Sequence, residues 1–252
     1  MRGYDNRSYG DGFADVYDDW YSDVTDVDDT VARAKALAGP GGRVVELGVG
    51  TGRLAVPMAE AGLDVVGVDS SQAMLDVLAR RDATGVVRTV RGDMVDDLPK
   101  GPFDVALIAY NTIFNLLEEA VQRRCFEAVT AVLRPGGAFV VEAFVPDSKV
   151  LQGSDVAVRS MTATQVVLSV SERWPREQRA DGQFIQFSES GGVRLRPWSI
   201  RWASPTELDA MATAAGFTVE ARMGDMGGSE FDDDSEQHVT IYRTALGGGR
   251  TT

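Results

Sequence analysis

Three glycines and two carboxylates stand close together around two apolar runs, RVVEL and VVGVD, and form the segment best suited to bind a ligand. Gly48, Gly50 and Gly52 follow the first run as G-x-G-x-G. Glu46 lies within that run, and Asp69 ends the second. A glycine-rich turn that joins a strand to a helix lets a ligand approach the backbone closely. The sequence therefore predicts a ligand-binding turn at these glycines.

The charge of the ligand decides between two classes of cofactor. The dinucleotide fingerprint is G-x-G-x-x-G, so one spacing here is a residue short, although an NAD-dependent oxidoreductase stays open as a weaker alternative. The carboxylate of Glu46 would repel a pyrophosphate and attract a cation. S-adenosylmethionine carries an ammonium and a sulfonium but no phosphate, and it is therefore the favoured ligand.

Strands and helices alternate around this turn. Near-continuous apolar strands are typical of a parallel sheet that is buried on both faces. The expected strands are 43–47, 64–68, 86–90, 103–109 and 137–143, and the expected helices are 52–61, 71–81 and 117–133. With two more strands near 217–223 and 237–243, the order predicts an α/β fold: a doubly wound, seven-stranded, mainly parallel sheet.

The N-terminal segment predicts a helical lid over residues 1–38. Aromatic side chains recur at three- and four-residue spacings, which places them on one face of a helix over 13–21: Phe13, Tyr17, Trp20 and Tyr21. Thr25 or Asp26 caps a second helix that runs to about Ala38. The aromatic face could cover a ligand or could simply be a buried helix face.

Residues 146–203 interrupt the alternation and predict a small antiparallel β insertion after strand five, used for substrate binding. They lack a helical period and are rich in β-branched and aromatic residues, which favours three strands over 156–172, 182–190 and 192–203. Ser204 then caps a helix. The α/β core therefore comprises 39–145 and 204–245, and the tail 246–252 is expected to be disordered.

Five motifs in order resemble the class I S-adenosylmethionine-dependent methyltransferases. They are VVELGVGTGRL, VVGVDSS, RGDM, FDVALIAYN and LRPGGAFVVE, and they extend over about residues 10–145. The resemblance implies a Rossmann-like methyltransferase fold, S-adenosyl-L-methionine as cofactor and S-adenosyl-L-homocysteine as product.

The resemblance also implies roles for individual residues. Asp69 would accept hydrogen bonds from the two ribose hydroxyls, Asp93 would accept from the adenine amino group, and Met94 would pack on the adenine ring. As alternatives, Asp69 could only cap the next helix and Asp93 could only shape a turn. The expected cofactor-binding residues are Tyr17, Tyr21, Glu46, Gly48, Gly50, Gly52, Arg53, Asp69, Ser70, Met74, Asp93, Met94 and Tyr110.

The methyl acceptor is expected to be a small molecule. The insertion resembles that of the amino-sugar N-methyltransferases of antibiotic biosynthesis, which implies methyl transfer to the nitrogen or oxygen of an amino sugar or another natural-product intermediate. Some of those relatives carry a histidine at the position of Asn115, which removes a histidine-based acid–base role there. The expected substrate-binding residues are Asn111, Phe114, Asn115, Phe144 and Trp198.

The sequence contains few residues that could act as a catalytic base. The catalytic candidates are Asn115 and His238, the one histidine, which could equally be structural. An amine needs only to arrive unprotonated, whereas a hydroxyl benefits from a base, so the scarcity favours nitrogen or an acidic hydroxyl such as a phenol. Arg201 lies three residues from Trp198 on a predicted strand, so at most one of the two is expected to line the substrate pocket.

Composition limits the partners, the cellular compartment and the kinds of site that the sequence predicts. The net charge of −13 disfavours nucleic acid and anionic membrane surfaces as partners. One cysteine, Cys125, and the absence of a signal-peptide pattern indicate a cytoplasmic protein. With one histidine and one cysteine, no metal site is expected. A homodimer remains open, as does an enzyme of the cyclase type that binds S-adenosylmethionine without methylating.

Overall fold

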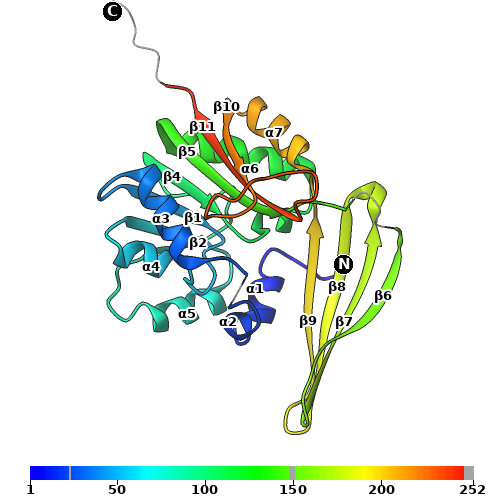
Figure 1. The fold of residues 1–252 in the computed structure, drawn as a ribbon. Coiled ribbons are helices and arrows are strands. Elements are labelled where there is room, and N and C mark those ends of the chain that lie inside the picture. The colour runs from blue at the N-terminus through cyan, green and yellow to red at the C-terminus, as the bar shows by residue number, and fades with distance from the viewer. Residues whose placement is uncertain (23, 148–150, 247–252) are drawn as a thin grey trace, which may run out of the picture.

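Two β-sheets organise the chain, one of seven strands and one of four (Figure 1). The computed structural model describes all residues except 23, 148–150 and 247–252. The predicted disordered tail therefore lies, from residue 247 onward, outside the described residues. None of the helices in the described part of the chain is long and apolar enough to cross a membrane.

The larger sheet confirms the predicted doubly wound α/β fold. Its strand order is β10-β11-β5-β4-β1-β2-β3, and only β11 runs antiparallel to its neighbours. Because the central strands are buried on both faces, their sequences are apolar almost throughout. The strands are β1 (Arg43–Leu47), β2 (Asp64–Asp69), β3 (Arg88–Arg91), β4 (Phe103–Ile108), β5 (Leu133–Phe144), β10 (Phe217–Met223) and β11 (Gln237–Thr244).

Helices cover both faces of this sheet and form two hydrophobic cores (Figure 1). One face packs against α3 (Val27–Ala38), α4 (Ala55–Glu60) and α5 (Gln72–Arg81). The other packs against α6 (Glu119–Val132) and α7 (Pro205–Ala214). A ligand therefore has access mainly at the sheet edge where the parallel strands end.

Side-chain caps fix where three of these helices begin. Asp26, not Thr25, caps α3 by accepting from the backbone N–H of Asp29. Ser204 caps α7 in a reciprocal capping box with Glu207, as its S-x-x-E pattern predicts. Ser71 caps α5, so Asp69 is not the cap of that helix.

The insertion has four strands, which corrects the prediction of three. They are β6 (Gly153–Met161), β7 (Gln165–Trp174), β8 (Arg179–Ser188) and β9 (Gly192–Arg201), with a short 3-10 helix, η2 (Pro175–Glu177), between β7 and β8. The expected strand 156–172 is divided by a turn in which the Thr162 N–H donates to the Gln165 carbonyl, at 2.8 Å. The strand expected from residue 182 begins at 179, because Gln178 makes the preceding turn in a left-handed conformation, with φ of 52°.

The N-terminal segment forms two short helices in place of the single helix predicted over 13–21. They are α1 (Ser8–Phe13) and α2 (Tyr17–Trp20). A tight turn separates them, because the Val16 N–H donates to the Phe13 carbonyl. Helix α1 contacts both α5 and β9, so the N-terminal segment lies between the large sheet and the insertion.

Candidate active site

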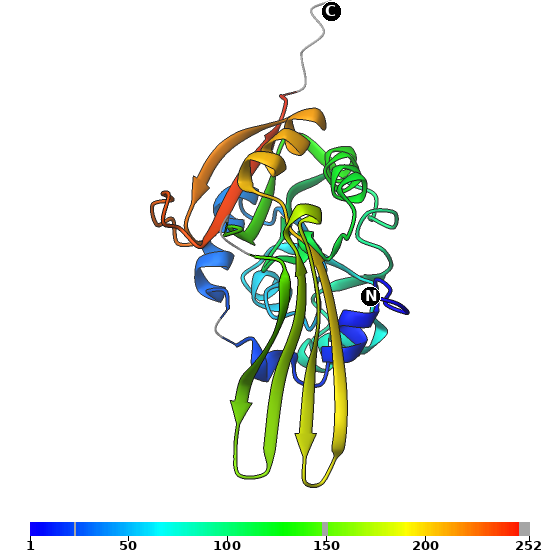
Figure 2. The same cartoon turned by 90° about the vertical axis from the view of Figure 1, so that its right-hand side faces the viewer.

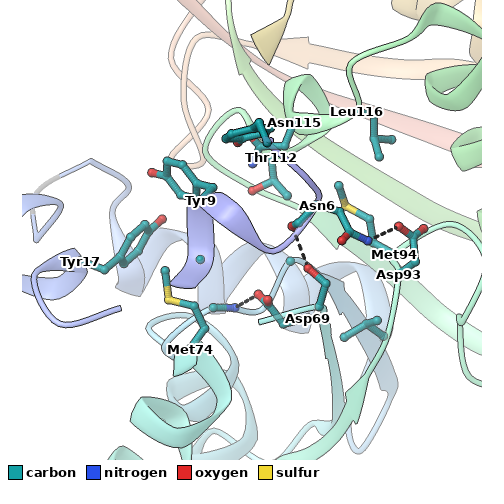
Figure 3. Close-up of a pocket in the computed structure, with 16 residues that line it drawn as sticks. Asn6, Tyr9, Tyr17, Asp69, Met74, Asp93, Met94, Thr112, Asn115 and Leu116 are labelled. Carbon is teal, nitrogen blue, oxygen red and sulfur yellow. Dashed lines mark hydrogen bonds between the residues drawn. The ribbon is translucent and has the colours of Figure 1, made fainter. Parts of the chain in front are cut away.

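A cavity opens at the carboxyl ends of β1, β2 and β3, beside α1 (Figure 3). It is lined by residues of the glycine-rich turn, of the segments that follow β2 and β3, and of the N-terminal segment. We call it the cofactor cavity. Many of the predicted cofactor residues line it: Tyr17, Gly48, Gly50, Asp69, Ser70, Met74, Asp93 and Met94.

The glycine-rich turn forms the floor of the cofactor cavity. Gly48 and Gly50 adopt φ values of 68° and 55°, which favour glycine. A Cβ on Gly48 would lie 2.5 Å from the methyl carbon of Thr112. The N–H groups of Gly48 and Val49 both donate to the Val68 carbonyl, so the turn is fixed to the end of β2.

Asp69 stands at the end of β2 with its carboxylate already oriented. Its Oδ2 accepts from the Gly50 N–H at 2.8 Å, and its Oδ1 accepts from the Ser71 N–H at 2.9 Å. Burial raises the pKa of Asp69, and these backbone donors oppose that shift. Each oxygen keeps a further lone pair, so the carboxylate can still accept from two neighbouring hydroxyls.

A smaller pocket, which we call the inner pocket, adjoins the cofactor cavity and contains Glu46, Arg53, Tyr17 and Tyr110. Glu46 is 4% exposed, and its Oε2 has no hydrogen-bond partner among the described residues. Burial raises the pKa of Glu46 to about 8, against the opposing charge of Arg53. A buried acceptor without a partner fits a ligand that brings a donor or a cation.

Asn6 bridges the ends of β2 and β3 across the cofactor cavity (Figure 3). Its side-chain amide donates to Asp93 Oδ2 at 3.1 Å, and its backbone carbonyl accepts from the Ser70 hydroxyl at 2.9 Å. The other oxygen of Asp93 accepts from the Val95 N–H. The N-terminal segment is therefore bonded to Asp93, for which the resemblance implies contact with adenine, and to Ser70, the residue that follows Asp69.

A second cavity, which we call the aromatic chamber, adjoins the cofactor cavity. Both cavities are lined by Tyr9, Tyr17, Thr112 and Asn115. The remaining residues of the chamber are Tyr21, Tyr110, Asn111, Phe144, Phe184, Trp198 and Ile200. The structure thus brings four of the five predicted substrate residues, Asn111, Asn115, Phe144 and Trp198, to one place.

The titratable groups that line the aromatic chamber are phenols. Burial raises the pKa of Tyr9, Tyr17 and Tyr21, and it raises the pKa of Tyr110 to about 12. All four therefore remain protonated near neutral pH. The described residues that line the chamber include no carboxylate, imidazole or thiol.

Two consecutive residues between the cavities have left-handed backbones. Tyr110 and Asn111 adopt φ values of 44° and 64°, which costs on the order of 1–3 kcal/mol for each non-glycine residue. Glu142 holds this turn, because its side chain accepts from the Tyr110 N–H and its carbonyl accepts from the Asn111 N–H. Asn111 Oδ1 in turn accepts from the Phe144 N–H at 2.6 Å. Strand β5 therefore fixes the position of Tyr110 between the inner pocket and the chamber.

Three predicted site residues line neither cavity nor the inner pocket. A Cβ on Gly52 would lie 2.7 Å from Leu78, so this glycine allows α5 to pack closely. Phe114 is fully buried in the core, and its ring centroid lies 4.8 Å from that of Phe144. His238 is buried on β11 with its Nδ1 2.9 Å from the Thr240 hydroxyl, and burial lowers its pKa to about 4.

Arg201 also lies outside the chamber, whereas Trp198 lines it. The Arg201 guanidinium donates to the side chain of Gln122 at 2.6 Å. Within the described part of the chain, no group of three or more His, Cys, Asp or Glu residues is placed to hold a metal ion.

The structure adds site residues that the sequence reasoning missed. The N-terminal ones are Asn6, Tyr9 and Gly10, which precede the aromatic helix expected over 13–21. Tyr9 carried a usable signal, because it lies four residues before Phe13 and extends the aromatic face; the two rings stack at 4.4 Å. Phe184 gave no signal of its own, since an aromatic residue in a strand is ordinary.

The fold and site define a methyltransferase, and comparison with known proteins agrees. The sequence matches the family described as "Methyltransferase domain" over residues 44–137. The structure of the CcbJ methyltransferase from Streptomyces caelestis superposes with a TM-score of 0.88 at 38% identity, covering 96% of this chain and 100% of CcbJ. This chain therefore belongs to the S-adenosylmethionine-dependent methyltransferases, and S-adenosylmethionine is its cofactor.

Two further relatives extend the comparison. The cypemycin N-terminal methyltransferase of Streptomyces sp is 29% identical over 207 residues, 80% of this chain and 82% of that protein. CalS10, an amino pentose methyltransferase from Micromonospora echinaspora, has a TM-score of 0.65 at 21% identity, covering 90% of this chain and 92% of its own. At that identity CalS10 supports the fold alone.

Proposed function

We propose that this methyltransferase acts on the neutral nitrogen of a small amine, such as an amino sugar or another amino-bearing natural-product intermediate. The observation that carries the proposal is the aromatic chamber, which adjoins the cofactor cavity; among the described residues that line it, the titratable side chains are neutral phenols. S-adenosylmethionine supplies an electrophilic methyl group. The protein then has to position an acceptor in line with it.

The cofactor cavity suits the adenosine part of the cofactor, and the inner pocket suits its methionine part. In this proposal Asp69 accepts from the ribose hydroxyls, and Asp93 with Met94 receives the adenine once Asn6 moves aside. The unpartnered Oε2 of Glu46 faces the methionine ammonium, which replaces the proton that burial favours on this carboxyl. Gly48 and Gly50 leave room for the chain between these ends.

An amine fits the chamber better than an alcohol. The nitrogen lone pair attacks the methyl carbon, the carbon–sulfur bond breaks, and S-adenosylhomocysteine leaves with the sulfur electron pair. The resulting ammonium loses its proton to water afterwards, so no base is needed in the transition state, whereas an alcohol benefits from one. Tyr110 and Trp198 also line the chamber, and an aromatic face attracts a cation by about 0.5–2 kcal/mol.

The names of two relatives point in the same direction. The cypemycin enzyme is named for methylation of an N-terminus, and CalS10 is named for an amino pentose. Both names specify acceptors that carry an amino group. We carry this shared chemistry, and not either particular substrate, over to the present chain.

Matched acceptors test the proposal. Amino sugars are compared with their N-acetylated and hydroxyl counterparts, and formation of S-adenosylhomocysteine is measured together with the mass of the product. We expect methylation of the amines only, with kcat/KM rising with pH and levelling at the pKa of each amine. Methylation of the hydroxyl compound in preference to the amine would refute the proposal. Conversion of an acceptor without S-adenosylhomocysteine would indicate the cyclase-type alternative.

A further inference from the structure

Arg159 lies on β6, an edge strand of the insertion, at a break in the strand register (Figure 2). Val158 pairs with Leu168 and Ser160 pairs with Val167, so Arg159 is an extra residue that has no partner on β7. Such a β-bulge re-aims a side chain and is over-represented next to active sites. Here the Arg159 side chain is directed toward the N-terminal helices.

The guanidinium of Arg159 lies over three aromatic rings. Its central carbon is 4.9 Å from the ring centroid of Trp20, 5.2 Å from that of Tyr21 and 4.7 Å from that of Phe184. Tyr21 and Phe184 both line the aromatic chamber. Because Arg159 is itself exposed, its guanidinium stands at the rim of the chamber, where it can contact part of a bound acceptor.

Arg159 has no carboxylate partner among the described residues. Other arginines of the same sheet do pair with carboxylates: Arg179, Arg194, Arg196 and Arg201. Within the described chain, the Arg159 guanidinium donates to the Trp20 carbonyl, at a long 3.4 Å. A guanidinium carries five N–H donors in a planar fork, so most of its donors remain available to a ligand.

The charge of Arg159 also acts within the aromatic chamber. Burial raises the pKa of Tyr21 and Tyr110, and the positive charge of Arg159 opposes that shift in both. In the proposed reaction a positive charge moves from the cofactor sulfur to the acceptor nitrogen. A second, uncompensated cation beside the chamber opposes that movement through like-charge repulsion. An acceptor that brings an anion to Arg159 removes this opposition.

We propose that Arg159 selects an acceptor that carries a carboxylate in addition to its amine. The inference rests on the proposed function, because it concerns the acceptor of that reaction. The guanidinium donates two parallel hydrogen bonds to the carboxylate while its face stays on the aromatic rings. A single guanidinium in a chain of net charge −13 balances one negative charge, so a carboxylate fits better than a phosphate monoester, which carries nearly two.

Matched pairs of amino sugars test the proposal, with kcat/KM measured as S-adenosylhomocysteine formed at a pH above the pKa of each amine. One pair is glucosaminuronic acid and its primary amide. The other is glucosamine phosphorylated on its primary hydroxyl and glucosamine itself. We expect wild type to prefer the carboxylate to its amide about 10-fold or more, the effect of one charged hydrogen bond. Raising the NaCl concentration from about 0.05 to about 0.5 M should reduce this preference, because salt screens an exposed ion pair.

Variants assign the preference to Arg159. Arg159→Gln should lower kcat/KM for the carboxylate about 10-fold, mainly through KM, and should change kcat/KM for the amide less than about twofold. The matched control is Arg194→Gln, which removes another exposed arginine of the same sheet, one already paired with Asp15, and should keep the preference. Arg159→Lys retains the charge without the planar fork and should keep part of the preference, which covers the case of a glutamine variant that folds poorly. S-adenosylmethionine should bind all three variants as it binds wild type.

Equal kcat/KM for the carboxylate and the amide in wild type, or a preference that Arg159→Gln retains, would overturn the proposal. A preference confined to the phosphate pair would assign Arg159 to a phosphate and overturn the carboxylate equally. If none of these amines is methylated, the proposed function fails for amino sugars, and calorimetric titration of the same compounds into the S-adenosylhomocysteine complex decides the role of Arg159. Binding specific to the carboxylate and lost in Arg159→Gln would then support the proposal, and titrations that do not distinguish the carboxylate from the amide would overturn it.

Discussion

Replacing Glu46 by glutamine should stabilise the ligand-free protein. Glutamine keeps the shape and polarity of the side chain but cannot ionise. Folding raises the pKa of Glu46 from its ordinary value of about 4.5 to about 8. A carboxyl whose pKa is raised by folding destabilises the folded state at every pH at which it would be ionised in the unfolded chain. The loss of stability therefore appears as pH rises above 4.5 and is complete above about 8.

The size of the effect follows from the two pKa values. pH 7 lies about 2.5 units above the ordinary pKa of the carboxyl and below its raised pKa. Each unit costs about 1.4 kcal/mol, so the loss of stability at pH 7 is on the order of 3 kcal/mol. At pH 5 the same relation gives less than about 1 kcal/mol. Urea unfolding of wild type and Glu46→Gln at pH 5, 7 and 9 measures the difference. Equal free energies of unfolding at pH 7 would refute the inference that burial raises the pKa of this carboxyl.

Glu46→Gln should weaken the binding of S-adenosylmethionine, although it stabilises the ligand-free protein. With a pKa of about 8, most Glu46 side chains are protonated at pH 7, and pairing with an ammonium requires the ionised form. Binding of S-adenosylmethionine to wild type should therefore release close to one proton, measured by calorimetry in buffers of different ionisation enthalpy. Glu46→Gln should abolish the release and weaken binding about 10-fold or more, the cost of a lost charged hydrogen bond.

The control ligand is methylthioadenosine, which lacks the amino acid part of the cofactor. It should bind wild type without proton release and should bind Glu46→Gln about as well as wild type. Proton release that persists in the glutamine variant would assign the titrating group to another residue. Equal affinity of the two proteins for S-adenosylmethionine would remove Glu46 from the cofactor site.

Three further predictions test other parts of the site. Asp69→Ala should weaken S-adenosylmethionine binding about 10-fold or more in the same calorimetric titration, and unchanged affinity would exclude the ribose contact. Gly10→Ala places a Cβ 2.5 Å from that of Ser71, so α1 should shift and limited proteolysis of the N-terminal segment should become faster without a change in the fold measured by circular dichroism. Arg196→Gln removes a buried guanidinium that donates to Asp15, and it should lower the free energy of unfolding by about 2 kcal/mol or more. The control is Arg194→Gln, which removes an exposed partner of the same carboxylate and should change the free energy of unfolding by less than about 1 kcal/mol.

The central sheet could be predicted from sequence because its signals are local. The strands β1, β2 and β4 are largely apolar runs of five or six residues, and the glycines of the first turn adopt backbone angles that favour glycine. Asp69 and Asp93 follow strands whose carboxyl ends must meet at one edge. Their positions in the cofactor cavity therefore needed no knowledge of distant contacts.

The N-terminal segment and the insertion were harder because their structure depends on contacts distant in sequence. The turn at Thr162–Gln165 contains no glycine or proline, so nothing in the local sequence divides the strand. Asn6 becomes a site residue only because Ser70 and Asp93 lie beside it, 64 and 87 residues away. Polar residues at a chain end give no sign of such partners.

The N-terminal helices connect the two halves of the site physically. Gly10 lies against Ser71 and Met74 at the cofactor cavity, while Gly12 lies against Pro197 of the insertion. Tyr9 and Tyr17 line the cofactor cavity and the aromatic chamber together. A cofactor that displaces Asn6 from Asp93 would therefore move a residue of the same segment that lines the aromatic chamber, which gives cofactor binding a route to affect that chamber.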